Sequence, residues 1–377
     1  MNVEKIREDF PVLKKKIIYL DSACMSLRPV QVIDKIKEYY EEYPACALRS
    51  SHKLASRATS EVKDARETIK KFIGAKKSKE IIFTKNTTES INLLANSFKF
   101  KKVLLTDREH NSNLLPWQKH KYGIFKVNSG FNLEKFSEIV KDYDFVSFVF
   151  TSNLDGYTLP VKEIIRIAHE NNCKVHLDAA QTVPHQEVNV RKLDVDFLSF
   201  SGHKMLGPSG IGVLYGKEEL LNGMDQFIVG GETVVNSTYD SFDVEDIPHK
   251  FEAGLQHYSG IIGLGAAAKY LSKVGMENVH DHEAKLIGAV DAEGLKVVGI
   301  KSPGIVNFNI PGVNYHEVAS ILDASKSIML RSGQHCVHSW YNANSIEGSA
   351  RASFYLYNTL EEVKILNEEL DKIKKLK

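Results

Sequence analysis

One lysine stands where a strand pattern gives way to a tight turn, a position that suits amine chemistry. The apolar run 197–200 ends in Ser201-Gly202-His203-Lys204, and a Gly/Pro-rich stretch leads into a second apolar run, 213–215. This pattern predicts strand, turn and strand. A lysine that apolar neighbours desolvate can lose its proton and act as an imine-forming amine. Taken alone, a turn lysine is more often an ordinary surface residue. The other residues of the sequence must therefore decide whether Lys204 is a reactive amine or a surface residue.

A carboxylate upstream is the first such companion. Asp178 ends the short apolar run 175–177 and precedes two alanines, so a planar ligand could approach it closely. A carboxylate can hold a protonated pyridine nitrogen, which makes the ring an electron sink, as in sites for pyridoxal phosphate. By itself Asp178 fits equally well as the N-cap of a helix. Its pairing with Lys204, each at the end of a predicted strand, favours the cofactor site.

Four motifs, spread over nearly the whole chain, together resemble one group of enzymes. They are Asp-Ala-Ala-Gln at 178–181, Ser-Gly-His-Lys at 201–204, the segment 331–336 and the segment 351–359. The set resembles the fold-type I enzymes that depend on pyridoxal phosphate, specifically the class V aminotransferase group and, within it, the SufS-like (group II) cysteine desulfurases. The resemblance implies an α/β fold, that of a fold-type I transferase. Its large domain would hold a mainly parallel seven-stranded sheet, followed by a smaller α/β C-terminal domain.

The resemblance also implies which residues hold the cofactor. They are Thr87, Thr88, His110, Asn153, Asp178, Gln181, Ser201, His203 and Lys204. Lys204 would bind pyridoxal phosphate covalently and then take the Cα proton of the substrate. Asp178 would face the ring nitrogen, and His110 would stack on the ring and move protons, although a lone histidine after a strand is more often structural. Read in isolation, Thr87 and Thr88 are simply part of a helix cap, Asn86 to Glu89, with free N–H groups that suit a phosphate.

The expected substrate is L-cysteine. By the same resemblance Arg351, with Asn153 and Arg331, would bind its carboxylate, because a guanidinium pairs with a carboxylate through two hydrogen bonds. Cys336 would attack the substrate sulfur and keep it as a persulfide while L-alanine leaves. Two rival activities on the same fold are selenocysteine lyase and aminotransferase, which depend less or not at all on Cys336. A non-catalytic scaffold is the alternative from another class.

The chain departs from the pattern of this family at four places. Cys24 replaces an alanine that lines the substrate pocket in this family. It is either an extra thiol near the reacting groups or simply a small buried apolar side chain. Ser50 stands where glycine is usual. Leu255-Gln256 stands where Thr-Pro is usual, and that threonine normally reaches the phosphate of the neighbouring subunit's cofactor; Gln256 or His257 could substitute for it. Gln334 replaces a histidine beside the expected nucleophile.

Strand and helix patterns predict the elements that position these residues. We expect strands at 81–84, 103–106, 145–151 and 174–178, with helices at 31–43, 86–98 and 160–171. A strand, a helix and a strand in succession favour a parallel sheet. In the C-terminal part we expect a long helix at 260–274, strands at 296–298 and 305–309, and helices at 315–324 and 360–375. The expected large domain is 17–262, and 1–16 with 263–377 form the small domain carrying Cys336.

Bulk properties limit the partners. A net charge of +1 in 377 residues gives no electrostatic reason to expect nucleic acid or an anionic membrane. The polar N-terminus predicts no signal peptide, and the four scattered cysteines predict neither a metal site nor disulfides, so we expect a cytoplasmic protein. The resemblance implies a homodimer and a protein that accepts the sulfur or serves as a scaffold, for iron–sulfur cluster assembly or related biosynthesis.

Overall fold

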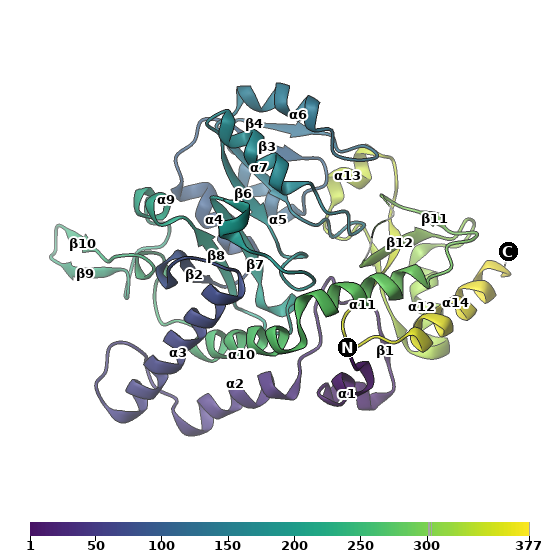
Figure 1. Cartoon of the computed structure of the whole chain (residues 1–377), viewed down its shortest axis with the longest axis horizontal. Coiled ribbons are helices and arrows are strands. Elements are labelled where there is room, and N and C mark those ends of the chain that lie inside the picture. The colour runs from purple at the N-terminus through teal and green to yellow at the C-terminus, as the bar shows by residue number, and fades with distance from the viewer. Residues whose placement is uncertain (301, 303, 377) are drawn as a thin grey trace.

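A seven-stranded sheet is the centre of the computed structural model, which describes residues 1–300, 302 and 304–376 (Figure 1). Its strands lie side by side in the order β2 (Ile81–Thr84), β8 (Gly212–Gly216), β7 (Phe197–Ser201), β6 (Lys174–Asp178), β5 (Phe145–Val149), β3 (Val103–Thr106) and β4 (Tyr122–Phe125). Within this sheet β8 is antiparallel to both of its neighbours, and the other pairs are parallel. The mainly parallel seven-stranded sheet is therefore confirmed.

Successive residues of a strand pack into different cores, because side chains alternate between the two faces of a sheet. On one side, Ile82 and Leu214 belong to a cluster with Ile91 and Leu94 of α4 (Thr87–Ser97). The next residues, Phe83 and Val213, belong to the largest cluster, which includes apolar residues of α2 (Val30–Glu42), α3 (Lys53–Phe72), α7 (Val161–Glu170) and α10 (Tyr258–Val274). The sheet is thus covered on both faces.

The helices that the sequence patterns predicted agree with the structure to within a few residues at their ends, whereas the long helix α3 was not predicted. Shorter helices complete the larger part of the chain: α5 (Asn111–Leu114), α6 (Leu133–Ile139), α8 (Val190–Leu193) and α9 (Glu218–Gly223). At the start of α4 the Asn86 side chain accepts a hydrogen bond from the backbone N–H of Glu89 at 3.0 Å. The Glu89 carboxylate, however, accepts from the backbone N–H of Lys85 rather than from Asn86. The predicted capping box is therefore half right, because Glu89 reaches past the cap residue.

A second, smaller sheet lies in the C-terminal part. It is antiparallel, in the order β11 (Lys296–Val297), β12 (Ile305–Asn309), β15 (Ser349–Ser353) and β14 (Arg331–Gly333). Around it lie α1 (Val3–Glu8), α11 (Met276–Gly288), α12 (Tyr315–Lys326), α13 (His338–Ala343) and α14 (Leu360–Lys374), and β1 (Ile18–Tyr19) pairs with β13 (Ile328–Met329). Ile18 and Leu20 pack in the core of this part. The domain division 17–262 against 1–16 and 263–377 stays a prediction, and its residues 301, 303 and 377 lie outside the described residues.

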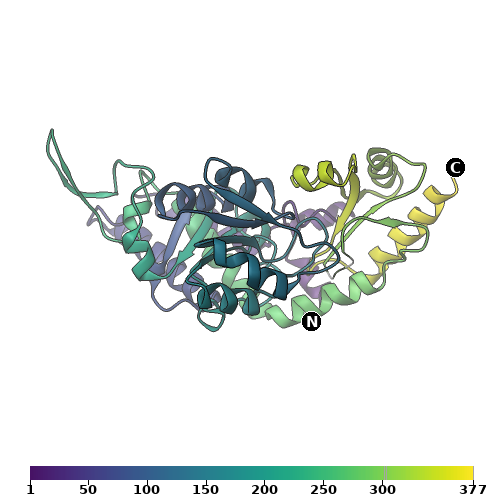
Figure 2. The same ribbon diagram turned by 90° about the horizontal axis from the view of Figure 1, so that it is seen from above.

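A two-stranded arm projects from the larger part of the molecule. It consists of β9 (Val234–Ser237) and β10 (Phe242–Val244), which pair with each other. Figure 2 shows the arm at one end of the molecule and the smaller sheet with α14 at the other. The arm exposes the apolar side chains of Val235, Tyr239, Phe242 and Val244. An isolated two-stranded ribbon is marginally stable in water, so such an arm needs something to pack against.

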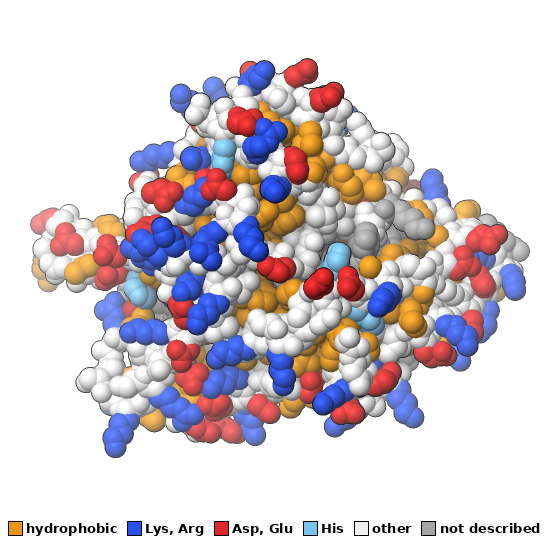
Figure 3. Space-filling model, viewed as in Figure 1, with side chains coloured by type: hydrophobic (Ala, Val, Ile, Leu, Met, Phe, Trp, Pro, Cys, Tyr) orange, Lys and Arg blue, Asp and Glu red, His pale blue; other side chains and the backbone are white. Residues whose placement is uncertain are grey.

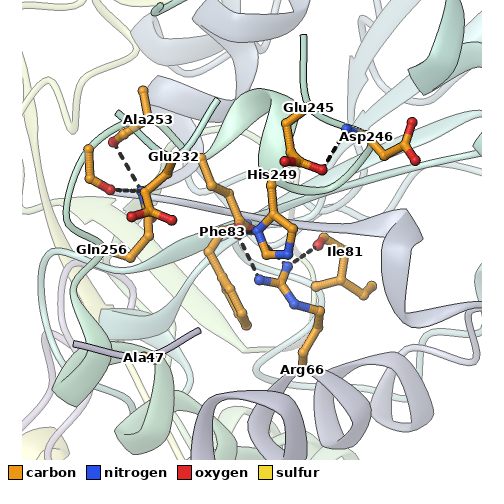
Figure 4. A network of polar contacts seen from close by, with 12 residues as sticks. Ala47, Arg66, Ile81, Phe83, Glu232, Glu245, Asp246, His249, Ala253 and Gln256 are labelled. Carbon is orange, nitrogen blue, oxygen red and sulfur yellow. Dashed lines mark hydrogen bonds and ion pairs between the residues drawn. The ribbon is translucent and has the colours of Figure 1, made fainter. Parts of the chain in front are cut away.

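A buried ion pair fastens α3 to the central sheet (Figure 4). The two Nη atoms of Arg66 donate to the two carboxylate oxygens of Glu252, each at 2.7 Å. Arg66 also donates to the carbonyl of Ile81, and the backbone N–H of Phe83 donates to Glu252 at 2.8 Å. Both side chains are less than 10% exposed. This pair therefore joins the helix, strand β2 and the segment before α10.

Replacing Glu252 with alanine should lower the free energy of unfolding by about 3 kcal/mol or more, because it leaves a buried guanidinium without its partner. Urea unfolding of the two proteins measures the difference. The matched control is Glu41→Ala, which breaks the exposed pair with Lys37 and should change stability little. Equal, small effects of the two substitutions would show that the Arg66–Glu252 pair does not fasten α3.

Candidate active site

The predicted site residues meet at one edge of the central sheet. Strands β5, β6 and β7 are parallel, so their carboxyl ends lie together. Asn153 follows β5, Asp178 ends β6, and Lys204 lies in the short 3-10 turn after β7. Ligands of open α/β sheets bind at this edge. The topology therefore brings together residues that are far apart in the sequence.

The start of helix α4 reaches the same edge because strand β8 passes very close to it. A Cβ atom on Gly212 would lie only 2.6 Å from the Cα atom of Asn86, so no larger residue fits there. Beside this contact, the backbone N–H of Thr87 donates to the Ser201 hydroxyl at 2.9 Å. The first turn of α4, with its positive dipole end, thus lies next to the turn that carries Lys204.

A cavity of about 790 Å³, counting its open mouth, occupies this edge. Eleven of the predicted residues line it: Thr87, Thr88, His110, Asn153, Asp178, Gln181, Ser201, His203, Lys204, Arg331 and Arg351. Cys336 is not among the lining residues, although its neighbour His335 and its partner Arg331 are. The structure thus places Cys336 next to the cavity rather than in its wall.

The Lys204 amine is poised to lose its proton. Its side chain reaches the cavity but is otherwise enclosed by protein, and this burial lowers the pKa of Lys204 below that of a free lysine. The Asp178 carboxylate opposes the shift, whereas the positive charge of Arg351 adds to it. A neutral amine is the nucleophilic form, so the site favours the chemistry expected of this lysine.

Asp178 is buried at the end of β6, with one oxygen accepting a hydrogen bond from the backbone N–H of Ala180 at 3.0 Å. Burial raises the pKa of Asp178, and this bond and Lys204 oppose the shift. Bringing a cationic group to such a carboxyl favours its charged form. Asp178 therefore suits a ligand that presents a protonated nitrogen.

His110 is neutral and has a fixed orientation. Its Nδ1 accepts a hydrogen bond from the backbone N–H of Ser112 at 3.1 Å, which leaves the ring proton on Nε2. Burial lowers the pKa of His110 to about 3, with further lowering by Lys204 and the two arginines Arg351 and Arg331. The ring can stack on a planar ligand without adding a charge to the cavity.

Hydroxyl groups gather at the α4 end of the cavity. The hydroxyls of Thr87 and Ser201 lie 2.6 Å apart, and those of Thr88 and Ser112 lie 2.7 Å apart. His203 lines the same end, and burial lowers its pKa to about 4. Hydroxyls and a helix N-terminus form a donor set that suits a phosphate.

Two arginines from neighbouring strands form the opposite end. Arg351 of β15 and Arg331 of β14 are direct cross-strand partners. Arg351 is 1% exposed, donates through Nη1 to the carbonyl of Asn153 at 2.7 Å and leaves its Nε without a partner. Asn153 likewise leaves its Oδ1 unpartnered, while its Nδ2 donates to the carbonyl of His335 at 2.8 Å. Both atoms are buried without a hydrogen-bond partner, which is uncommon for polar groups in proteins.

The loop with Cys336 holds a strained backbone next to Arg331. His335 and Cys336 have φ angles of 50° and 60°, a left-handed conformation that costs a non-glycine residue about 1–3 kcal/mol. Hydrogen bonds from Asn153 and from the backbone N–H of Asn111 to the two carbonyls, each 2.8 Å long, hold this conformation. Arg331 Nη2 lies 3.5 Å from the Cys336 sulfur. A guanidinium at this distance stabilises a thiolate.

Some lining residues were not among the predicted site residues. They are Ala23, Asn86, Ser112, Val149, Thr151, Ala180 and His335. Most are small or uncharged and matter through position alone, so the sequence carries no signal for them. Cys24, which the sequence flagged as a departure, also lines the cavity. Gln256 donates to the carbonyls of Ala253 and Gly254 instead of reaching the cavity of its own chain.

The chemistry of these groups fits pyridoxal phosphate. The hydroxyls and the first turn of α4 suit its phosphate, Asp178 suits its ring nitrogen, and Lys204 suits its aldehyde. The guanidinium groups of Arg351 and Arg331, which line the opposite end, remain for the substrate carboxylate. The described residues contain no group of three His, Cys, Asp or Glu side chains that could hold a metal ion. Nor, among these residues, is any helix both long enough and apolar enough to cross a membrane.

Comparisons with known proteins agree with this chemistry. A "Probable cysteine desulfurase" of Halalkalibacterium halodurans is 39% identical over 99% of this chain and 98% of its own. A "Cysteine desulfurase" of Haloferax volcanii is 36% identical over 100% of this chain and 98% of its own. The apo structure of a cysteine desulfurase from Thermococcus onnurineus superposes with a TM-score of 0.95, at 36% identity, over 100% of this chain and 99% of that one.

The family profile described as "Aminotransferase class-V" matches residues 18–366, which is nearly the whole length. Enzymes of this family depend on pyridoxal phosphate, in agreement with the cavity. The fold-type I α/β architecture expected from the sequence is therefore confirmed, and the chain belongs to the class V aminotransferase family.

Proposed function

We propose that the protein is a cysteine desulfurase, converting L-cysteine into L-alanine and a persulfide on Cys336. One observation carries the proposal. The Cys336 thiol lies against Arg331, beside a cavity that also holds Lys204, Asp178 and Arg351. An aminotransferase needs the lysine and the carboxylate but has no use for a thiol placed there. The full-length similarity to proteins named cysteine desulfurase supports the same activity.

Each residue contributes one part of the reaction. When bound, pyridoxal phosphate supplies an electron sink for cleavage of bonds at the substrate's Cα. Lys204 holds the cofactor before the substrate arrives and then, as a free amine, takes the Cα proton. Asp178 keeps a proton on the ring nitrogen, while Arg351 fixes the substrate carboxylate. His110, with its proton on Nε2, would border the ring and donate a proton to the departing product.

Cys336 takes the sulfur. Its thiolate attacks the sulfur atom of the substrate, a new S–S bond forms, and the bond between that sulfur and the substrate's Cβ breaks. The electron pair of the broken bond goes to the carbon skeleton, which gains protons and leaves as alanine. The outer sulfur remains on Cys336 as a persulfide. Arg331 supports this step because it stabilises the attacking thiolate.

The decisive assay measures alanine and sulfide from L-cysteine with the cofactor-loaded protein and a thiol reductant. We expect equal amounts of the two products. Alanine formed only from L-selenocysteine would assign a selenocysteine lyase. Exchange of the amino group with a 2-oxo acid, without sulfide, would assign an aminotransferase. A protein that neither binds the cofactor nor forms alanine would be the scaffold.

We further propose the SufS-like subtype, with a separate protein as sulfur acceptor or scaffold for iron–sulfur cluster assembly or related biosynthesis. The support is the short loop between β14 and α13, whose two carbonyls are tied down at His335 and Cys336. Such a loop does not extend far from the cavity, so an acceptor must come to the thiol. A cytoplasmic location is part of this proposal, because all four cysteines are free.

A homodimer is the last part of the proposal. The projecting arm bears exposed apolar side chains, including Val235, which is 67% exposed, and Phe242. Leu255, at 75% exposure, adds to them where the family usually has threonine. Figure 3 shows hydrophobic and acidic side chains side by side on the arm. The family resemblance implies that a second copy of the chain packs against this surface.

We expect the mass measured by light scattering to be that of two chains. The double substitution Val235→Asp and Phe242→Asp should shift it toward one chain, because each places a charge in the apolar contact. Lys162→Asp, a charge change on the exposed side of α7, is the control. A dimer that survives the double substitution would show that the arm is not in the interface.

A further inference from the structure

A second thiol lies inside the active-site cavity. Cys24 follows strand β1, where the backbone N–H of Ala23 donates to the Ser353 hydroxyl and that of Cys24 donates to the carbonyl of Asp21. These bonds hold the turn against β15. The Cys24 side chain lines the same cavity as Lys204. The proposed reaction at Cys336 makes no use of it.

Positive charge surrounds Cys24. Burial by itself lowers the pKa of Arg331. Cys24, and to a smaller extent Cys336, raise this pKa, and the net shift is upward. The pKa values of Lys204 and Arg351 are lowered, chiefly by burial. Cys24 opposes this shift in both residues. Cys24 thus shares the cavity with three cationic side chains, those of Lys204, Arg331 and Arg351.

The two remaining cysteines lack this setting. Cys173 is buried in the core, and burial raises its pKa to about 12. Cys46 lies near the carbonyl of Ala47 and the hydroxyl of Tyr258, outside the cavity. Neither is near the arginine pair. Cys24 and Cys336 are therefore set apart by sharing one guanidinium, that of Arg331.

The transferred sulfur moves from the cavity that Cys24 lines to Cys336, whose partner Arg331 lines the same cavity. The sulfur atom starts on the substrate, inside the cavity that Cys24 and Lys204 line. Once bonded to Cys336, it extends that side chain by an S–S bond of about 2 Å. Because Arg331 lies 3.5 Å from the Cys336 sulfur and also lines the cavity, the added sulfur is carried on a side chain that borders the cavity.

We propose that Cys24 is a second sulfur carrier, which takes the outer sulfur of the Cys336 persulfide. This inference rests on the proposed desulfurase function. The Cys24 thiolate attacks the outer sulfur, and a new S–S bond forms between them. The bond from that sulfur to Cys336 breaks, and its electron pair stays on Cys336 as a thiolate. Any proton on the outer sulfur moves with it, and no outside oxidant or reductant is consumed.

Arg331 favours this direction of attack. Thiol–disulfide exchange is faster when the leaving thiolate is stabilised, and Cys336 would leave facing the Arg331 guanidinium. Attack on the inner sulfur would instead expel hydrosulfide and join the two cysteines. Transfer of the outer sulfur keeps it inside the cavity, away from reductants in solution.

The test follows the added sulfur by peptide mass. The cofactor-loaded protein is mixed with L-cysteine without reductant, its thiols and persulfides are trapped by alkylation, and the Cys24 and Cys336 peptides are compared. We expect one added sulfur on part of each. Cys24→Ser should leave all added sulfur on Cys336, and Cys336→Ala should remove it from Cys24 as well. The Cys46 peptide is the internal control and should gain none.

Other results would overturn the inference. Sulfur on Cys336 alone in the unsubstituted protein would leave Cys24 as a small apolar group. Sulfur on Cys24 in Cys336→Ala would mean that it reacts directly with the substrate. Absence of sulfur from both peptides, with no alanine, would instead be a failure of the proposed function.

A measurement without cofactor or substrate tests the charge setting. In the cofactor-free protein, iodoacetamide should alkylate Cys24 several times faster than Cys46. Arg331→Gln should slow the Cys24 reaction, since it removes one of the charges facing the thiol. Equal rates at Cys24 and Cys46 would overturn the claim that the cavity activates Cys24.

Discussion

Replacing Cys336 with alanine should abolish the persulfide and lower the rate of alanine formation from L-cysteine by about 100-fold or more, as is usual when a covalent nucleophile is removed. The reason is that the Cys336 thiol lies 3.5 Å from the Arg331 guanidinium, which stabilises the attacking form. Cofactor binding should persist, because Cys336 is not among the residues that line the cavity. Alanine release under steady-state conditions measures the effect.

Cys46→Ala is the matched control for this substitution, since its thiol lies near Ala47 and Tyr258 instead of the cavity. It should retain the full rate. If alanine formation survived in Cys336→Ala, the thiol would not be the sulfur acceptor. The activity would then be that of a selenocysteine lyase or an aminotransferase.

Replacing Lys204 with methionine should lower alanine formation by about 1,000-fold or more. The variant loses both the amine that holds the cofactor and the base that takes the Cα proton, and a general base alone contributes about 10²–10⁴. The absorbance of the protein-bound cofactor should change to that of the free aldehyde. Lys99→Met, at an exposed lysine, is the control. An unchanged spectrum would show that Lys204 does not bind the cofactor.

The same variant gives a pH-dependent result in the cofactor-free protein. Because burial lowers the pKa of Lys204, the unfolded chain binds this proton more readily than the folded chain does. Between the folded pKa and the unfolded value of about 10.4, stability therefore rises with pH. Urea unfolding should show this slope reduced in Lys204→Met. An identical slope in both proteins would mean that Lys204 keeps its proton when folded.

Local patterns were sufficient to predict much of the fold. The Gly/Pro-rich stretch after Lys204 separates two apolar runs, and these form β7 and β8. The capping side chain of Asn86 marks the start of α4. By contrast, the pairing of β1 with β13 joins segments from opposite ends of the chain. No periodicity in either two-residue strand specifies such a partner.

The site shows the same limit. Resemblance pointed to Arg331 and Arg351 separately, yet only the register of β14 and β15 makes them direct neighbours. Ser112 and Thr151 could not be assigned to the site from the sequence, because small polar residues give no chemical signal there. Only the folded structure, which brings the strand ends together, places them at the cavity. Cys336 was expected at the centre of the chemistry, and the structure places it beside the cavity, held by Arg331. Long-range packing decides these positions.

The most direct test of the central claim is the mass of the protein after a single turnover with L-cysteine, without reductant. The account predicts that alanine appears together with an equal amount of protein-bound sulfur, and that this sulfur depends on Cys336. Alanine formed while no sulfur is bound to the protein would contradict it.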